Sequence, residues 1–177
     1  ATENIALYYN TDLVPTPPTT WDEVKTLSKA IKDAGTKYGF LFQTVGDPYH
    51  FYPIQTAFGG YVFGKNADGS YNAEDLGLNS EGSVAALTWL NGLYEDGLLD
   101  RNGNIDGGLL LSAFQNKDAA MVISGPWALN GFREAGVPFA VTDIPAGTET
   151  GRPFLGVQGF MINAFSPNKV LAQAFLT

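Results

Sequence analysis

Aromatic side chains in two short segments are the residues of this sequence best suited to binding chemistry. Trp127 follows an apolar run and a Gly-Pro pair, a pattern typical of a strand that leads into a helix. Residues 47–53 contain Tyr49 among four successive ring-bearing residues. Rings pack against the CH faces of a sugar, and sugar hydroxyls need acceptors such as the carboxylates of Glu3 and Asp47. We therefore expect a carbohydrate to be bound by these side chains.

Each of these residues also has a structural role open to it. Trp127 could fill the core, because indole rings bury large areas anywhere in a protein. Asp47 precedes Pro48 and could be the N-cap of a helix that begins there. One helix cannot bury four successive rings on a single face, so at least one of them, with Tyr49 as the candidate, should reach a cleft.

Catalytic and metal-binding chemistry have few candidates. His50 is the only histidine and there is no cysteine, which excludes a histidine-rich zinc site and leaves a Ser-His-Asp triad dependent on one residue. The oxygen-rich stretch 100–106 departs from the EF-hand pattern and favours a solvated turn. We expect no metal, no cofactor and no enzymatic activity. The alternative is a glycoside hydrolase that uses Glu3 and Asp47 as its pair of carboxylates.

Composition and charge narrow the possible partners and the domain organisation of the chain. The net charge is −8 with only ten Lys and Arg, and these are scattered, so nucleic acid is not an expected partner. A length of 177 residues with 45% hydrophobic content suits one well-cored domain. Both ends read as interrupted elements, and we expect the chain to be part of a longer protein. This interpretation is compatible with a single domain that has been excised from the longer protein as an autonomous module.

Strands and helices alternate along the chain, which predicts an α/β sheet flanked by helices, with ligands at the loop ends. Thr20 and Glu23 fit a capping box, and Gly35 is a natural helix end. Residues 66–69 are a turn signal within 61–71, which we expect to form a hairpin or an irregular loop. Asn79 is the expected cap of the next long helix. Its expected apolar stripe is Val84, Leu87, Leu90 and Tyr94. Strands are expected near 4–10, 38–43, 120–124, 139–143 and 157–163, and helices near 20–35, 47–58, 79–97, 108–116 and from 167 onward.

Seven short segments carry a resemblance when they are read together and in order: residues 7–13, 20–23, 47–49, 58–61, 113–115, 124–127 and 162–167. They resemble the maltose-binding protein family, the solute-binding proteins of ATP-driven sugar importers. The resemblance spans essentially the whole chain. It implies that residues 1–177 form a single α/β lobe with a mixed sheet flanked by helices, the C-terminal lobe of a two-lobe periplasmic-binding-protein-like fold, without the N-terminal lobe and the final helices.

The resemblance also implies roles for individual residues. Tyr49 and Trp127 would stack on the sugar, and Glu3 would supply a carboxylate near the crossover between lobes. Asp47, before Pro48, stands where family members often have Glu, and Gln158 would come from a strand that enters the cleft.

For the whole protein, the resemblance implies a maltodextrin-like ligand and an ABC transporter permease in the membrane as partner. The implied location is periplasmic, or extracellular with a lipid anchor. Weak sugar binding by the lobe alone is expected, and apolar surface normally covered by the missing parts could cause self-association.

Overall fold

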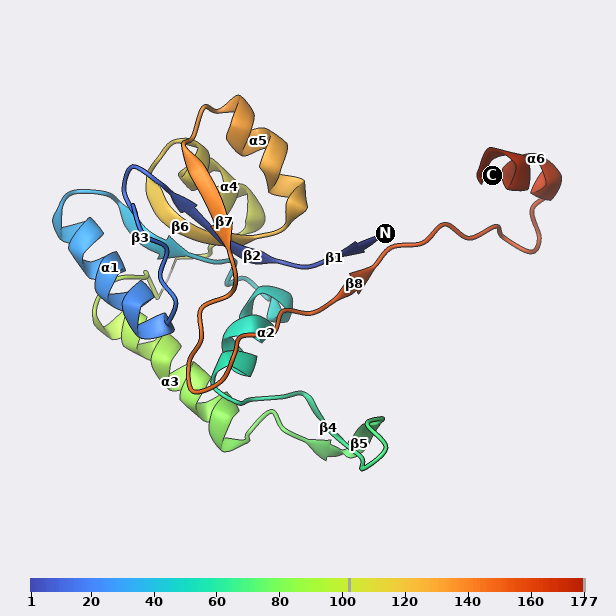
Figure 1. Cartoon of the computed structure of the whole chain (residues 1–177), viewed down its shortest axis with the longest axis horizontal. Helices are drawn as coiled ribbons and strands as arrows, with labels where there is room; N and C mark the ends of the chain where they lie inside the picture. Colours follow the sequence, from blue (N-terminus) through green and yellow to red (C-terminus); the bar gives the residue numbers. More distant parts are fainter. Residues whose placement is uncertain (102, 177) are drawn as a thin grey trace.

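A four-stranded mixed sheet forms the centre of the computed structural model, which describes residues 1–101 and 103–176 (Figure 1). The strand order is β3-β6-β2-β7; β3 runs parallel to β6, and β2 runs antiparallel to both of its neighbours. This confirms the predicted α/β class with a mixed sheet. The strands are β2 (Ala6–Asn10), β3 (Tyr38–Leu41), β6 (Ala119–Ser124) and β7 (Phe139–Thr142).

Ring contacts identify the helices that cover the two faces of the sheet. Phe40 of β3 packs on Trp21 of α1 and Trp89 of α3, with ring centroids 5.5 and 6.5 Å away. Tyr8 of β2 packs on Phe132 of α5 at 5.5 Å. The register across β6 places Phe40 and Tyr8 on opposite faces, because successive side chains of a strand alternate. The helices are α1 (Trp21–Asp33), α2 (Pro48–Ala57), α3 (Glu81–Glu95), α4 (Gly107–Gln115) and α5 (Leu129–Glu134).

Helix α1 begins and ends at the predicted residues. The backbone N–H of Glu23 donates to the Thr20 hydroxyl at 3.2 Å, and the backbone N–H of Thr20 donates to the Glu23 carboxylate at 3.3 Å. This reciprocal pair satisfies two backbone donors that a helix start leaves open. Gly35, with φ of 102°, follows the last turn, as expected of a residue that ends a helix.

Two predictions about helix α3 are wrong. Its N-cap is Ser80, not Asn79, because the Ser80 hydroxyl accepts from the backbone N–H of Ser83. Val84 and Leu87 of the predicted apolar stripe are 52% and 51% exposed.

Small residues determine which face of helix α3 packs against helix α2. A Cβ at Gly82 would stand 2.4 Å from the backbone of Gly59, and the buried Ser83 hydroxyl accepts from Gln55 at 2.8 Å. The start of α3 therefore approaches the end of α2 closely on its small-residue side, and the face with Val84 and Leu87 turns to solvent.

The predicted hairpin is present as β4 (Phe63–Lys65) and β5 (Tyr71–Leu76). The backbone N–H of Asn66 donates to the Ser70 carbonyl at 2.9 Å, and Gly69 has φ of 84°. The turn signal Asn66-Ala67-Asp68-Gly69 is thereby confirmed.

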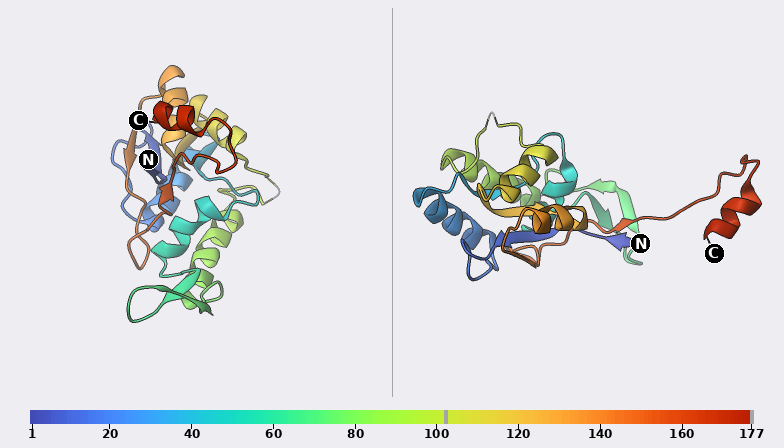
Figure 2. Two further views of the ribbon diagram at one scale, coloured as in Figure 1. Left: turned by 90° about the vertical axis from the view of Figure 1, so that its right-hand side faces the viewer. Right: turned by 90° about the horizontal axis from the view of Figure 1, so that it is seen from above.

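The last part of the chain leaves the body of the molecule. Strand β8 (Gly156–Val157) pairs with β1 (Thr2–Glu3) in a two-stranded ribbon, so the strand predicted for residues 157–163 is wrong beyond Val157. Only two residues of β1 are available for pairing, and the following segment has no partner strand in the described chain. Helix α6 (Lys169–Leu176) lies apart at the end of this extended segment and has no buried residue in its described part (Figures 1 and 2). Among the described residues, no helix combines the length and apolarity that a membrane crossing requires.

Candidate ligand-binding site

Trp127 lies in the short 3-10 helix η1 (Pro126–Ala128) between β6 and α5. Its ring lies against Gly125, where a Cβ would stand 2.2 Å from a ring carbon. The Tyr8 hydroxyl donates to the Gly125 carbonyl at 2.8 Å and ties this turn to the sheet. The indole is 50% exposed, so the alternative that Trp127 fills the core is wrong.

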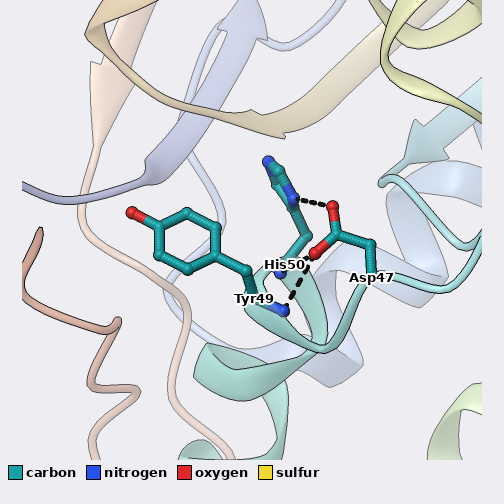
Figure 3. Close-up of polar contacts among 3 residues, drawn as sticks. All are labelled: Asp47, Tyr49 and His50. Atoms are coloured by element: carbon teal, nitrogen blue, oxygen red, sulfur yellow. Dashed lines mark hydrogen bonds and ion pairs between the residues drawn. The ribbon is translucent and has the colours of Figure 1, made fainter.

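Asp47 is the N-cap of α2, as predicted, with Pro48 at the first helical position. One oxygen of its carboxylate, Oδ1, accepts from the backbone N–H groups of Tyr49 and His50 at 2.9 and 3.2 Å. The other oxygen, Oδ2, lies 2.6 Å from Nδ1 of His50 (Figure 3). Both oxygens of Asp47 are thus engaged at the start of α2.

Ring contacts connect Trp127 to α2. The imidazole of His50 lies edge to face with Trp127 at 6.3 Å and with Tyr49 at 5.5 Å. Tyr49 contacts Phe154 at 6.1 Å, and Phe154 contacts Tyr52 at 6.3 Å. We call these five residues the aromatic row. It joins three segments that are far apart in the chain.

Glu3 and Gln158 meet at the β1–β8 ribbon. The Gln158 side-chain amide donates to Oε1 of Glu3 at 2.9 Å, and Glu3 stands opposite Gly156 in the ribbon. Burial raises the pKa of the Tyr49 hydroxyl, and the negative charges of Glu3 and Asp47 raise it further. The Tyr49 hydroxyl therefore keeps its proton at neutral pH and can donate a hydrogen bond.

An open hollow of about 430 Å³ lies beside the aromatic row. Three residues of the row, Tyr49, Tyr52 and Phe154, also form part of the wall of the hollow. The wall is mostly apolar and comes from the start of α2, the β4–β5 hairpin and the loop before β8. Its residues are Pro48, Tyr49, Tyr52, Val62, Phe63, Tyr71 and Phe154.

The structure thus brings together the residues that the sequence suggested separately. Tyr49 and Trp127 are linked through His50, and Glu3 pairs with Gln158 and acts on Tyr49. The sequence suggests His50 only as a zinc ligand, a triad residue or one of four successive rings, and it does not predict Tyr52 or Phe154 as individual site residues. Ring contacts between distant segments depend on tertiary packing. In the sequence, only the run of rings in residues 49–52 indicated that rings would gather at a site.

Two further sequence predictions concern metals and catalysis. No group of three or more possible metal ligands is present in residues 1–101 and 103–176. Asn102, in the oxygen-rich stretch 100–106, lies outside the described residues, and Asp106 of this stretch is the N-cap of α4. The engagement of both Asp47 oxygens at α2 leaves that carboxylate poorly suited to proton transfer, so the geometry offers nothing in favour of a hydrolase pair with Glu3.

This chain thus combines a mixed α/β sheet with an aromatic row and with carboxylates at the β1–β8 ribbon and the start of α2. Comparison with known proteins identifies its class: the sequence model of the bacterial extracellular solute-binding proteins matches residues 1–177. The chain belongs to this family.

Individual relatives are named as oligosaccharide-binding proteins. The chain is 38% identical over 182 residues to a galactooligosaccharide-binding protein of Bacillus subtilis, covering 98% of this chain and 42% of the relative. It is 31% identical over 185 residues to a maltodextrin-binding protein of the same organism, covering 98% and 43%. A maltooligosaccharide ABC transporter solute-binding lipoprotein of Streptococcus pneumoniae is 34% identical over 151 residues, covering 81% and 34%. The chain spans about two fifths of the length of the first two relatives.

Proposed function

We propose that this chain is one lobe of a two-lobe solute-binding protein that binds an oligosaccharide for an ABC importer. The observation that carries the proposal is the aromatic row, in which the half-exposed Trp127 and the half-buried Tyr49 lie on either side of His50. Burial raises the pKa of the Tyr49 hydroxyl, and the negative charges of Glu3 and Asp47 raise it further. Family membership and the names of the relatives support the same function.

The proposed site divides the work between rings and polar groups. Trp127 and Tyr49 would stack on the CH faces of the sugar. Glu3, whose carboxylate is oriented by Gln158, would accept hydrogen bonds from hydroxyls, and Pro48 would line the approach to Tyr49. Asp47 would act mainly through the side chains that it orients, because its oxygens already hold α2 and His50.

Binding by one lobe is expected to be weak. Each sugar hydroxyl that leaves water must regain partners, and a neutral hydrogen bond contributes only about 0.5–1.5 kcal/mol net. Stacking and exclusion of water must supply the rest. A second lobe that closes over the ligand would complete the enclosure.

The relatives agree on the class of protein, but their names include more than one kind of sugar. A maltodextrin-like ligand is our proposal, and galactooligosaccharides are the alternative within the same class, because the names of the relatives include both. For the whole protein we propose a permease in the membrane as partner, and a location outside the cytoplasmic membrane, periplasmic or lipid-anchored. Self-association through exposed apolar side chains of the last segment is proposed for the chain alone.

An NMR titration of this chain with maltotriose, and separately with β-1,4-galactotriose, tests the proposal. The chain has three tryptophans, and a Trp127→Phe variant assigns the indole N–H of Trp127. We expect that signal to shift at millimolar sugar. Trp21 and Trp89 are 0% and 9% exposed and serve as internal controls whose signals should stay. Absence of any shift of Trp127 and Tyr49 with both sugars would refute the proposed function.

A further inference from the structure

His50 is a polar side chain whose place in the site no sequence pattern assigned. The residue is 8% exposed and lies between the rings of Tyr49 and Trp127, nearly perpendicular to both. Its Nδ1 is bonded to Asp47. Its second nitrogen, Nε2, is bonded by no described residue and still has access to solvent. In Figure 3 this nitrogen points away from Asp47 and from helix α2.

We propose that His50 is a specificity-determining residue that accepts a hydrogen bond from a sugar hydroxyl through Nε2. The proposal rests on the oligosaccharide-binding function proposed above. In it, Asp47 is a positioning residue, because its carboxylate keeps the imidazole proton on Nδ1 and leaves the lone pair on Nε2.

The hydrogen bonds of Asp47 determine this tautomer. An ionised carboxylate only accepts, so the 2.6 Å contact to Nδ1 requires a proton on that nitrogen. The carboxylate cannot turn away, since its other oxygen accepts the two backbone N–H groups at the start of α2. A neutral imidazole with its proton on Nδ1 presents Nε2 as an acceptor only.

The location of Nε2 connects the acceptor to the ligand. The imidazole that carries this nitrogen lies within the aromatic row, between the two rings that we expect to stack on the sugar. A sugar held on Tyr49 and Trp127 would bring a hydroxyl to this nitrogen, and a sugar whose hydroxyl at that position pointed elsewhere would cover the acceptor and leave it without a partner. Unpaired buried polar groups are costly, so such an acceptor discriminates between stereoisomers.

Nitrogen-15 NMR of the imidazole tests the tautomer directly, because the chain has a single histidine and its signals need no further assignment. We expect the proton on Nδ1 and an unprotonated Nε2, as the contact to Asp47 requires. A protonated Nε2, whether alone or together with Nδ1, would overturn the proposal. In the same sample, addition of maltotriose or galactotriose should shift the Nε2 signal together with the indole signal of Trp127.

Two variants separate the role of His50 from simple packing. Asp47→Asn keeps an oxygen for the cap, but its amide donates to Nδ1, so the proton should move to Nε2 and sugar affinity should fall. His50→Phe keeps a ring in the row and removes the acceptor, and affinity should fall by about threefold to tenfold, the range of one net hydrogen bond. Unchanged affinity in His50→Phe would overturn the proposal even if Asp47→Asn did not fold.

The outcomes distinguish this proposal from the one on which it rests. If Trp127 shifts with sugar and Nε2 does not, the role of His50 is wrong and the binding function stands. If neither signal moves with either sugar, both proposals fall.

Discussion

Gly125 contributes to the site by lacking a side chain. A Cβ at this position would stand 2.2 Å from the Trp127 ring, and the φ of −110° at Gly125 is one that alanine adopts readily. Gly125→Ala should therefore leave the backbone in place and push the indole away from its resting position. We expect sugar affinity to fall by up to the cost of Trp127→Ala, which is about 1–3 kcal/mol by analogy with other stacking aromatics.

Titration of the Gly125→Ala chain with maltotriose, followed at the indole signals, measures this loss. A Cβ at Gly159 would meet nothing within 4 Å, so Gly159→Ala is the matched control and should bind as the original chain does. Equal affinity in all three chains would show that the position of the indole does not matter for binding.

Local signals allowed some of the site residues to be predicted from sequence, and long-range packing hid the others. The cap by Asp47 follows from its place before Pro48, a pattern read within one helical turn. The sequence does not decide whether Trp127 is exposed, because its exposure depends on the close approach of the ring to Gly125. Phe154 reaches Tyr49 across about a hundred residues of chain, and no spacing rule detects such a contact.

At the scale of elements, the capping box of α1 predicts a pH-dependent contribution to stability. Hydrogen bonds from the backbone and side chain of Thr19 lower the pKa of Glu23. A carboxyl whose pKa is lower in the folded state stabilises the fold fully above its unfolded pKa of about 4.3, and this contribution is lost as pH falls through the folded pKa. Glu23→Gln should thus be less stable than the original chain near neutral pH and match it in strong acid.

Urea unfolding of both chains between neutral and acidic pH checks this sign. The exposed Glu134, at the end of α5, offers a control through Glu134→Gln, which should give no such convergence. A Glu23→Gln deficit that grew as the pH fell would contradict the capping role of the carboxylate.

The elements themselves were predictable where one short segment contained all the information. The start of α1, the turn of the β4–β5 hairpin and the start of α2 each have their signal within four residues. The buried face of α3 was predicted wrongly because Gly82 and Ser83, which look unremarkable in sequence, allow close approach to α2. The length of β8 was overestimated because strand length depends on the partner, and β1 provides only two residues.

At the scale of the whole molecule, the two-lobe proposal predicts a large difference in affinity. A protein that carries this chain together with a partner lobe should bind its oligosaccharide far more tightly than the chain alone, because closure buries both faces of the sugar. Calorimetry with maltose, maltotriose and galactotriose on both proteins measures the difference. Comparable tight affinity in both would contradict the two-lobe account.

The segment after β8 predicts the behaviour of the chain in solution. It exposes large apolar side chains, among them Phe160 at 88%, Phe165 at 95% and Phe175 at 87%, and α6 lies apart from the sheet (Figure 1). Contiguous apolar surface in water favours association. We therefore expect the chain to self-associate with increasing concentration, as measured by analytical ultracentrifugation. Removal of residues 159–177 should abolish this association.

The same truncation tests whether the segment contributes to folding. Helix α6 buries no residue in its described part. The truncation keeps the hydrogen bonds that join Gln158 to Ala1 and Glu3 in the β1–β8 ribbon. The free energy of unfolding of the truncated chain, extrapolated to infinite dilution, should therefore equal that of the full chain. A truncated chain that still associates would shift the cause to the exposed Val84 and Leu87 of α3, and the double variant Val84→Ser, Leu87→Ser would then be the one that restores a monomer.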